Sequence, residues 1–225
     1  MSYAVSKLAQ FNNAGGQRHM DKALHTLAYA KATSGYSIIY RRESNLELTD
    51  LVTNNTASDQ LGQNLPTDTV WTWTDSSHGG PKPQAGLVST FADGAVSYSS
   101  YRSTLTGLSS CENEVAAATK AIQTACTNHN ILRFFGIGKS DSTPPILCDN
   151  LAAVQLADGD ANSKRLKHVA TRVAFLQESV QEKKASIYHV GTSGQLADIM
   201  TKPLPAAQFH ELRRHLVGNP IPEVH

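Results

Sequence analysis

Four carboxylates stand at the ends of predicted strands or on predicted helices: Asp75, Glu114, Asp149 and Asp198. Ligands of open α/β sheets gather beyond the strand ends, so Asp75 and Asp149 would meet if their strands were neighbours. Converging carboxylates bind hard divalent cations such as Mg²⁺. Two such ions would clamp the attacking and leaving oxygens of an in-line phosphoryl displacement. The pattern therefore indicates metal-assisted phosphoryl chemistry.

Each carboxylate also has an ordinary structural interpretation. Asp75 precedes Ser-Ser-His-Gly-Gly, which is common turn chemistry. Glu114 could favour the helix dipole, although Glu112 is better placed because it completes a capping box. Asp149 could cap the next helix, and Asp198 could be a solvated helix charge. The order and placement of all four together favour the metal site.

A continuous pattern of elements from residue 70 would position these side chains. Trp71 and Trp73 share the parity of Asp75 in a strand-like run, and we interpret them as core rather than as platforms for stacking bases. Asp93-Gly94 indicates a hairpin between the next two strands. The remaining elements are predicted by range: strands at 86–92, 95–101, 146–149 and 185–190, and helices at 109–130, 152–156, 162–183, from 193 and at 206–216.

This order predicts an α/β fold. It is a mixed five-stranded sheet, with three antiparallel strands followed by alternating helix and strand, and with helices on both faces. Two amphipathic helices and a strand at 36–40 precede it and form an N-terminal appendage. The predicted divisions are an appendage at 1–42, a linker at 43–69 with room for one short element near 46–52, the α/β domain at 70–216 and a tail at 217–225.

Composition excludes several classes of protein. The chain has 225 residues, of which 40% are hydrophobic and 17% charged, as expected of a folded chain. The net charge of +1 provides no global basic field, so any nucleic-acid binding must depend on a local patch. No apolar run is long enough for a membrane helix, and no secretory signal begins the chain. Three cysteines without C-x-x-C spacing indicate reduced thiols, an intracellular (cytoplasmic or nuclear) location and no zinc site.

Several motifs resemble one family in order along the chain. Gln195–Leu204 resembles the ADILTKPL signature of Ty1/copia-type retrotransposon polyproteins. The other matching runs are 108–114, similar to LSSTEAE, 148–153, similar to CDNQSA, and 167–178, similar to KHIDIRYHFIRE. Together they resemble the ribonuclease H domain of that family. Residues 3–31 resemble the end of its reverse transcriptase, but no paired-aspartate motif indicates polymerase activity.

This resemblance implies a ribonuclease H-like fold and a metal-dependent endonuclease, a hydrolase that cleaves the RNA strand of RNA–DNA hybrids. By motif, Asp75, Glu114, Asp149 and Asp198 are the catalytic residues and the ligands of two Mg²⁺ ions, for which Mn²⁺ is a substitute. The products would carry a 5′-phosphate and a 3′-hydroxyl. The implied partners are the hybrid and the remainder of a reverse transcriptase, with no membrane.

Candidate substrate contacts lie near these positions. Ser110 and Asn150 would reach the minor-groove side of a hybrid, where 2′-hydroxyls distinguish RNA from DNA. Lys164, Arg165 and Lys167 form a small basic cluster, for which a solvated helix face is an equally good interpretation.

Two departures from the family pattern remove positive charge, at 80–86 and at 98–103. Both positions would meet phosphates, so the affinity for a hybrid is affected more than the chemistry. Two alternatives therefore remain open. One is a captured retrotransposon fragment that acts as a non-catalytic binding protein, and the other is a related two-metal nuclease that acts on branched or single-stranded DNA.

Overall fold

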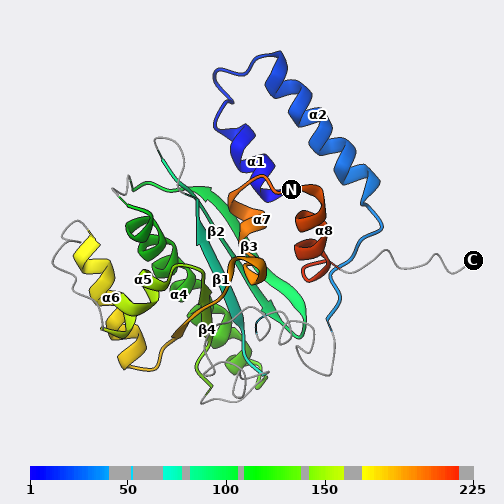
Figure 1. The fold of residues 1–225 in the computed structure, drawn as a ribbon. Coiled ribbons are helices and arrows are strands. Elements are labelled where there is room, and N and C mark those ends of the chain that lie inside the picture. Colours follow the sequence, from blue (N-terminus) through cyan, green and yellow to red (C-terminus); the bar gives the residue numbers. More distant parts are fainter. Residues whose placement is uncertain are drawn as a thin grey trace, which may run out of the picture.

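The computed structural model describes residues 1–40, 52, 68–77, 82–105, 109–137, 142–159 and 169–217. Five strands form one sheet in the order β3-β2-β1-β4-β5 (Figure 1). Their bounds are Trp71–Ser76 for β1, Gln84–Phe91 for β2, Gly94–Arg102 for β3, Pro145–Cys148 for β4 and Ser186–His189 for β5. This confirms the predicted mixed five-stranded sheet.

The first three strands form an antiparallel meander. The turn between β2 and β3 lies one residue earlier than predicted, because Phe91 pairs with Gly94 and the central residues are Ala92 and Asp93. Both have positive φ, 51° and 60°, as a tight hairpin turn requires. Gly94 is needed for another reason: a Cβ there would collide with the ring of Tyr40.

The two later strands extend the sheet in parallel from β1. Thr74 of β1 pairs with Cys148 of β4, and Cys148 in turn pairs with His189 of β5. Because β1 and β4 are parallel neighbours, their carboxyl ends meet at one edge of the sheet. This is the condition under which Asp75 and Asp149 were predicted to meet.

Helices cover both faces of the sheet (Figure 1). The helices α4 (Ser110–Phe134), α5 (Leu151–Asp158) and α6 (Ala170–Gln181) contribute to a core on one face that includes Ile146 and Cys148. On the other face α7 (Asp198–Thr201) and α8 (Ala206–Arg214) pack near Trp71, Trp73 and Leu147. Both tryptophans are fully buried, which confirms that they belong to the core.

Two predicted helices differ from the structure, and the start of a third is not tested. The helix α4 continues to Phe134 rather than ending near 130, and residues 162–168 of the predicted long helix lie outside the described residues. The helix expected from 193 is instead a 3-10 turn, Thr192–Gly194, followed by the four-residue α7. The Gln195 side chain interrupts it, because its amide donates to the Thr74 carbonyl at 3.0 Å and accepts from Ala197 N at 3.2 Å.

The N-terminal appendage contains α1 (Ser2–Ala9) and α2 (Gln17–Ala32). The strand predicted at 36–40 is wrong, since this segment joins no sheet among the described residues. Side-chain contacts hold it instead. Tyr40 donates from its hydroxyl to the Ala95 carbonyl at 2.9 Å, and the Tyr36 hydroxyl accepts from Arg213 at 3.1 Å.

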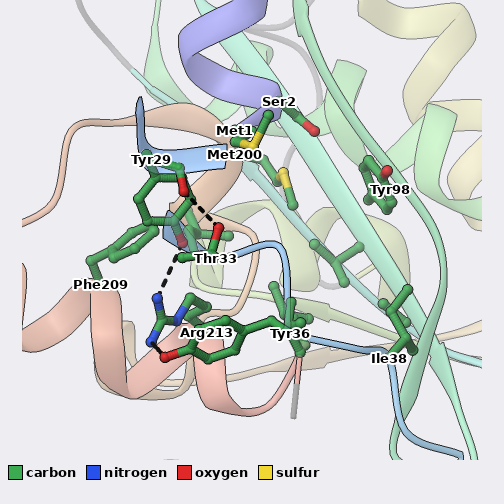
Figure 2. Close-up of a pocket in the computed structure, with 15 residues that line it drawn as sticks. Met1, Ser2, Tyr29, Thr33, Tyr36, Ile38, Tyr98, Met200, Phe209 and Arg213 are labelled. Atoms are coloured by element: carbon green, nitrogen blue, oxygen red, sulfur yellow. Dashed lines mark hydrogen bonds between the residues drawn. The ribbon is translucent and has the colours of Figure 1, made fainter. Parts of the chain in front are cut away.

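The appendage docks on the α/β domain through polar and aromatic contacts. Figure 2 shows Arg213 of α8 between the hydroxyls of Tyr29 and Tyr36, at the wall of a cavity of about 250 Å³. Neither α1 nor α2 has a buried residue, and the predicted apolar stripe of α2 remains more than half exposed at Met20, Leu24 and Leu27.

The predicted linker and tail lie largely outside the described residues. No helix within the described part of the chain is long and apolar enough to cross a bilayer.

Candidate active site

The four predicted carboxylates come together at the carboxyl ends of β1 and β4. Ligand atoms of Asp75, Asp149 and Asp198 all lie within 4.8 Å of one another, and so do those of Glu114, Cys148 and Asp149. Asp149 therefore belongs to both groups. It is also the accessible member, because it is half-buried while the other three carboxylates are between 1% and 4% exposed.

Local structure explains how each carboxylate reaches this place. Ser109 caps α4 by accepting from Glu112 N at 3.2 Å, so Glu114 lies just inside the helix. Its Oε1 then accepts from Ser76 N at 2.9 Å, which ties the helix to the end of β1. Asn150 caps α5 by accepting from Ala153 N at 3.1 Å. The cap is therefore Asn150, and the Asp149 carboxylate remains available as a ligand.

Electrostatic crowding makes this site hold protons or cations. Burial, with the nearby charges of Asp75 and Asp149, raises the pKa of Glu114 to about 9. Burial also raises the pKa of Asp198 to about 7, although its hydrogen bond to Lys202 opposes the rise. The pKa of Asp149 is raised by burial and by Asp75. Buried carboxylates this close ionise together only when a positive charge compensates them.

Lys202 supplies one such charge, and the motif analysis did not single it out. Its Nζ lies 2.7 Å from Asp198 Oδ1 and 3.7 Å from Asp75 Oδ2. Burial opposes its charge, but the hydrogen bond to Asp198 and the charge of Asp75 raise its pKa overall. Thr201 also donates to Asp75 Oδ2. The sequence offered one signal for this pair: Lys202 follows Asp198 by four residues, the spacing at which side chains on a helix are neighbours.

The predicted substrate contacts have different outcomes. Ser110 is the exposed first residue of α4, beside the site, and Asn150 follows Asp149 with its side-chain oxygen engaged in the cap. His189, at the end of β5, was not predicted as a contact; its Nε2 lies 3.2 Å from the backbone carbonyl oxygen of Asp149. The basic cluster predicted at Lys164, Arg165 and Lys167 lies outside the described residues.

A different set of cations lines a cavity beside α4. Arg102 of β3, Lys120 of α4 and Arg172 of α6 line this cavity of about 340 Å³, together with Thr104 and Thr119. Lys120 follows Glu114 by six residues, which places the cavity about 9 Å from the acidic site along the helix axis. Sequence reasoning missed this cavity because its cations come from three separate elements.

The donor set fits a hard divalent cation. Oxygens around octahedral Mg²⁺ lie about 3 to 4 Å apart, since each is about 2.1 Å from the ion. The oxygens of Asp75, Asp149 and Asp198 already lie within 4.8 Å of one another, so small side-chain movements would complete such a shell. The three carboxylates would hold the ion, provided that the Lys202 ammonium gives up its place.

The sheet order and its acidic edge define a chain with a ribonuclease H-like α/β fold. The resemblance to retrotransposon polyproteins is confirmed, because the chain is similar to segments of retrovirus-related Pol polyproteins. It is 27% identical to that from transposon RE1 of Arabidopsis thaliana over 99% of this chain. It is 24% identical to that from transposon TNT 1-94 of Nicotiana tabacum over 97% of this chain. The chain spans 14% and 15% of the lengths of these relatives. No protein-family model matches it.

Solved structures with a similar arrangement were also found. The N-terminal RNase H domain of a Mycobacterium tuberculosis protein has a TM-score of 0.45 and 14% identity, covering 65% of this chain and 96% of that one. RNase H1 from Halobacterium salinarum has a TM-score of 0.42 and 15% identity, covering 59% of this chain and 94% of that one.

Proposed function

We propose that this chain is a metal-dependent endonuclease of the ribonuclease H type, which cleaves the RNA strand of RNA–DNA hybrids. The observation that carries the proposal is the convergence of Asp75, Glu114, Asp149 and Asp198 from four elements at one edge of the sheet. Such a cluster of carboxylates would hold divalent cations, and these cations would stabilise the negative charge that develops on the attacking and leaving oxygens during phosphodiester hydrolysis.

Each residue has a defined part in this proposal. Asp75, Glu114, Asp149 and Asp198 would together hold the Mg²⁺ ions. Bound ions activate the attacking water and stabilise the leaving oxygen. The Ser76 amide keeps the Glu114 carboxylate oriented. The half-buried Asp149 faces the solvent side from which the scissile phosphate would approach.

The substrate would extend from the acidic site along α4. Three cationic side chains, Arg102, Lys120 and Arg172, line one cavity and could accept a backbone phosphate. They would compensate for the positive charge that this chain lacks at the two departures from the family pattern. Ser110 is the first residue of α4 and Asn150 follows Asp149, and both are proposed to contact the 2′-hydroxyl side of the hybrid.

A cleavage assay tests the proposal. The chain is incubated with a labelled RNA–DNA hybrid and either Mg²⁺ or Mn²⁺, beside an Asp149→Asn variant and a Lys22→Met surface control. We expect cleavage of the RNA strand by the unmutated chain and the control, and at least about a hundredfold loss in Asp149→Asn. No cleavage with either metal would refute the enzyme.

Two further arms separate the alternatives. Cleavage that survives Asp149→Asn would refute the site assignment. Cleavage of branched DNA without cleavage of the hybrid would select the related DNA nuclease. Hybrid binding without any cleavage would select the non-catalytic binding protein.

A further inference from the structure

A fully buried glutamine lies where the N-terminal appendage meets the α/β domain. Gln84 begins β2 and is 0% exposed, so its amide depends on partners within the protein. Its Nε2 donates to Ser6 Oγ of α1 at 2.8 Å and to Ser100 Oγ of β3 at 2.9 Å. Its Oε1 accepts from Gln10 Nε2, at the end of α1, at 3.3 Å. One buried amide therefore joins the appendage to the sheet.

Ser100 continues this connection to α7. Its hydroxyl donates to the Met200 carbonyl at 2.6 Å. The hydroxyl has a single proton, so its lone pairs are what accept from Gln84. The bonds thus run in one direction from α1 to α7, and hydrogen bonds in such a chain strengthen one another. They end inside α7, two residues after Asp198.

α7 lies across a single row of the sheet. Asp75 pairs with Gly86, and Gly86 pairs with Ser100, so the three residues lie side by side on one face. The helix approaches this row closely, because a Cβ on Gly86 would collide with Met200 and Thr201. At one end of the row Thr201 donates to Asp75 Oδ2. At the other end Ser100 donates to the Met200 carbonyl, so α7 is held on both sides of Gly86.

The position of α7 decides whether Asp198 reaches the acidic site. Asp198 is the first residue of this four-residue helix, which is too short to be stable without contacts to the rest of the protein. Its ligand atom lies within 4.8 Å of those of Asp75 and Asp149. Metal ligands depend on the hydrogen bonds behind them for their orientation. Loss of the bond to Met200 would therefore free one side of α7 and let Asp198 move away from Asp75.

The two central members of this chain of bonds lie in the two stretches that depart from the family pattern. Gln84 belongs to 80–86 and Ser100 to 98–103. In the structure these stretches pair with each other, with Gln84 opposite Arg102 and Gly86 opposite Ser100. The departures that remove positive charge thus also contain the two polar side chains that connect α1 to α7.

We propose that Ser100 is a positioning residue for the metal site, and that α1 of the appendage, through Gln84 and Ser100, sets how tightly this site binds divalent cations. Neither side chain is among the four carboxylates. Ser100 acts on Asp198 by holding the Met200 carbonyl. The inference rests on the proposed function in taking the carboxylates as metal ligands, and metal binding without substrate tests it.

Manganese binding provides the measurement. Free Mn²⁺ is followed by electron paramagnetic resonance as the ion is titrated into the full chain, Ser100→Ala and Ser100→Thr, with folding checked by circular dichroism. Ser100→Ala removes both bonds and should weaken Mn²⁺ binding about tenfold. Ser100→Thr keeps the hydroxyl on a residue that suits a strand, so it should bind Mn²⁺ nearly as tightly as the unmutated chain.

Ser97→Ala is the matched control on the same strand. The Ser97 hydroxyl accepts from Asn128 of α4 at 2.8 Å, so this variant loses a hydrogen bond to a helix other than α7 and should keep its Mn²⁺ affinity. Unchanged affinity in folded Ser100→Ala would overturn the inference. An equal loss in Ser97→Ala would do so too, since it would indicate a general structural effect. Absence of Mn²⁺ binding to the unmutated chain would also overturn it.

Ser6→Ala tests the part assigned to the appendage, and it gives an answer even if Ser100→Ala fails to fold. It removes one partner of Gln84 and should weaken Mn²⁺ binding about threefold. Combined with Ser100→Ala it should add little, because both changes act through the same bonds. Unchanged affinity in Ser6→Ala, or a combined loss equal to the product of the two, would refute the link to α1.

Cleavage measured beside these titrations separates the inference from the proposed function. In Ser100→Ala the Mg²⁺ concentration for half-maximal cleavage should rise about tenfold, while KM for the hybrid at saturating Mg²⁺ is unchanged. The expected differences in Mn²⁺ binding without any cleavage of the hybrid would refute the nuclease and leave the positioning role standing. Cleavage with equal Mn²⁺ binding by the unmutated chain and Ser100→Ala would do the reverse.

Discussion

The buried Glu114 should make the stability of the metal-free protein fall as the pH rises. Its pKa in the folded state is about 9, against an ordinary value of 4.5. The folded protein thus keeps a proton that the unfolded chain releases between these values. A raised pKa contributes stability that is complete below the unfolded pKa and is lost as the pH rises towards the folded one.

The magnitude follows from one proton. Stability changes by about 1.4 kcal/mol for each pH unit when one group differs in protonation between the folded and unfolded states. Between pH 6 and pH 8 the Glu114 contribution should therefore fall by about 2 to 3 kcal/mol. Glu114→Gln places a neutral amide of similar shape at this position and removes the proton.

The assay is urea unfolding in EDTA at pH 6, 7 and 8, with the unmutated chain beside Glu114→Gln. The difference in unfolding free energy between the two should shift in favour of Glu114→Gln by about 2 to 3 kcal/mol from pH 6 to pH 8. Asp149 and Asp198 titrate in both chains, so the comparison isolates position 114. Glu178→Gln is the matched control, because that side chain is 63% exposed and should leave the pH dependence unchanged.

Parallel pH curves for the unmutated chain and Glu114→Gln would refute the reasoning, since Glu114 would then be ionised or solvated in the folded protein. Adding Mg²⁺ should flatten the pH dependence of the unmutated chain, because a bound ion replaces the proton.

Three further predictions concern the cations. Lys202→Met should tighten Mg²⁺ binding about tenfold in a thermal-shift titration, because the ammonium no longer competes for Asp75 and Asp198; equal or weaker binding would contradict this. Arg172→Gln should raise KM for the hybrid and leave kcat unchanged. It should also reduce the slope of log affinity against log salt concentration by about one, as expected for the loss of one phosphate contact. A change in kcat alone would count against a phosphate contact. Arg213→Ala should destabilise the docked appendage by about 1 to 3 kcal/mol, seen as faster proteolysis in 1–40, since Arg213 bonds to two tyrosine hydroxyls. Arg214→Ala is the control: Arg214 pairs with Glu211 on the exposed surface, and its loss should not destabilise the docked appendage.

The succession of strands and helices along the chain was predictable, because hydrophobic periodicity and turn residues act locally, whereas the order of the strands in the sheet was not predicted. Alternation in 70–76 places Trp71 and Trp73 on one face, and the structure buries both. Helix ends were less predictable, since they depend on side chains from distant elements. Gln195 bonds to the Thr74 carbonyl and so divides the helix expected from 193.

The exposed stripe of α2 shows a related limit of periodicity. Apolar spacing at Met20, Leu24 and Leu27 predicts a face that packs, but it does not say what the face packs against. In this chain the contacts of the appendage come from tyrosines and Arg213 instead.

The sequence alone determined which four carboxylates to consider, because their positions in the predicted elements and in the family motifs are properties of chain order. It could not decide what stands beside them. Only the tertiary structure placed Lys202 between Asp75 and Asp198, and Cys148 against Glu114. Only it gathered Arg102, Lys120 and Arg172 around one cavity. Metal choice and substrate affinity depend on distances between residues far apart in the chain, and such distances are set when β1, β4 and α4 pack together.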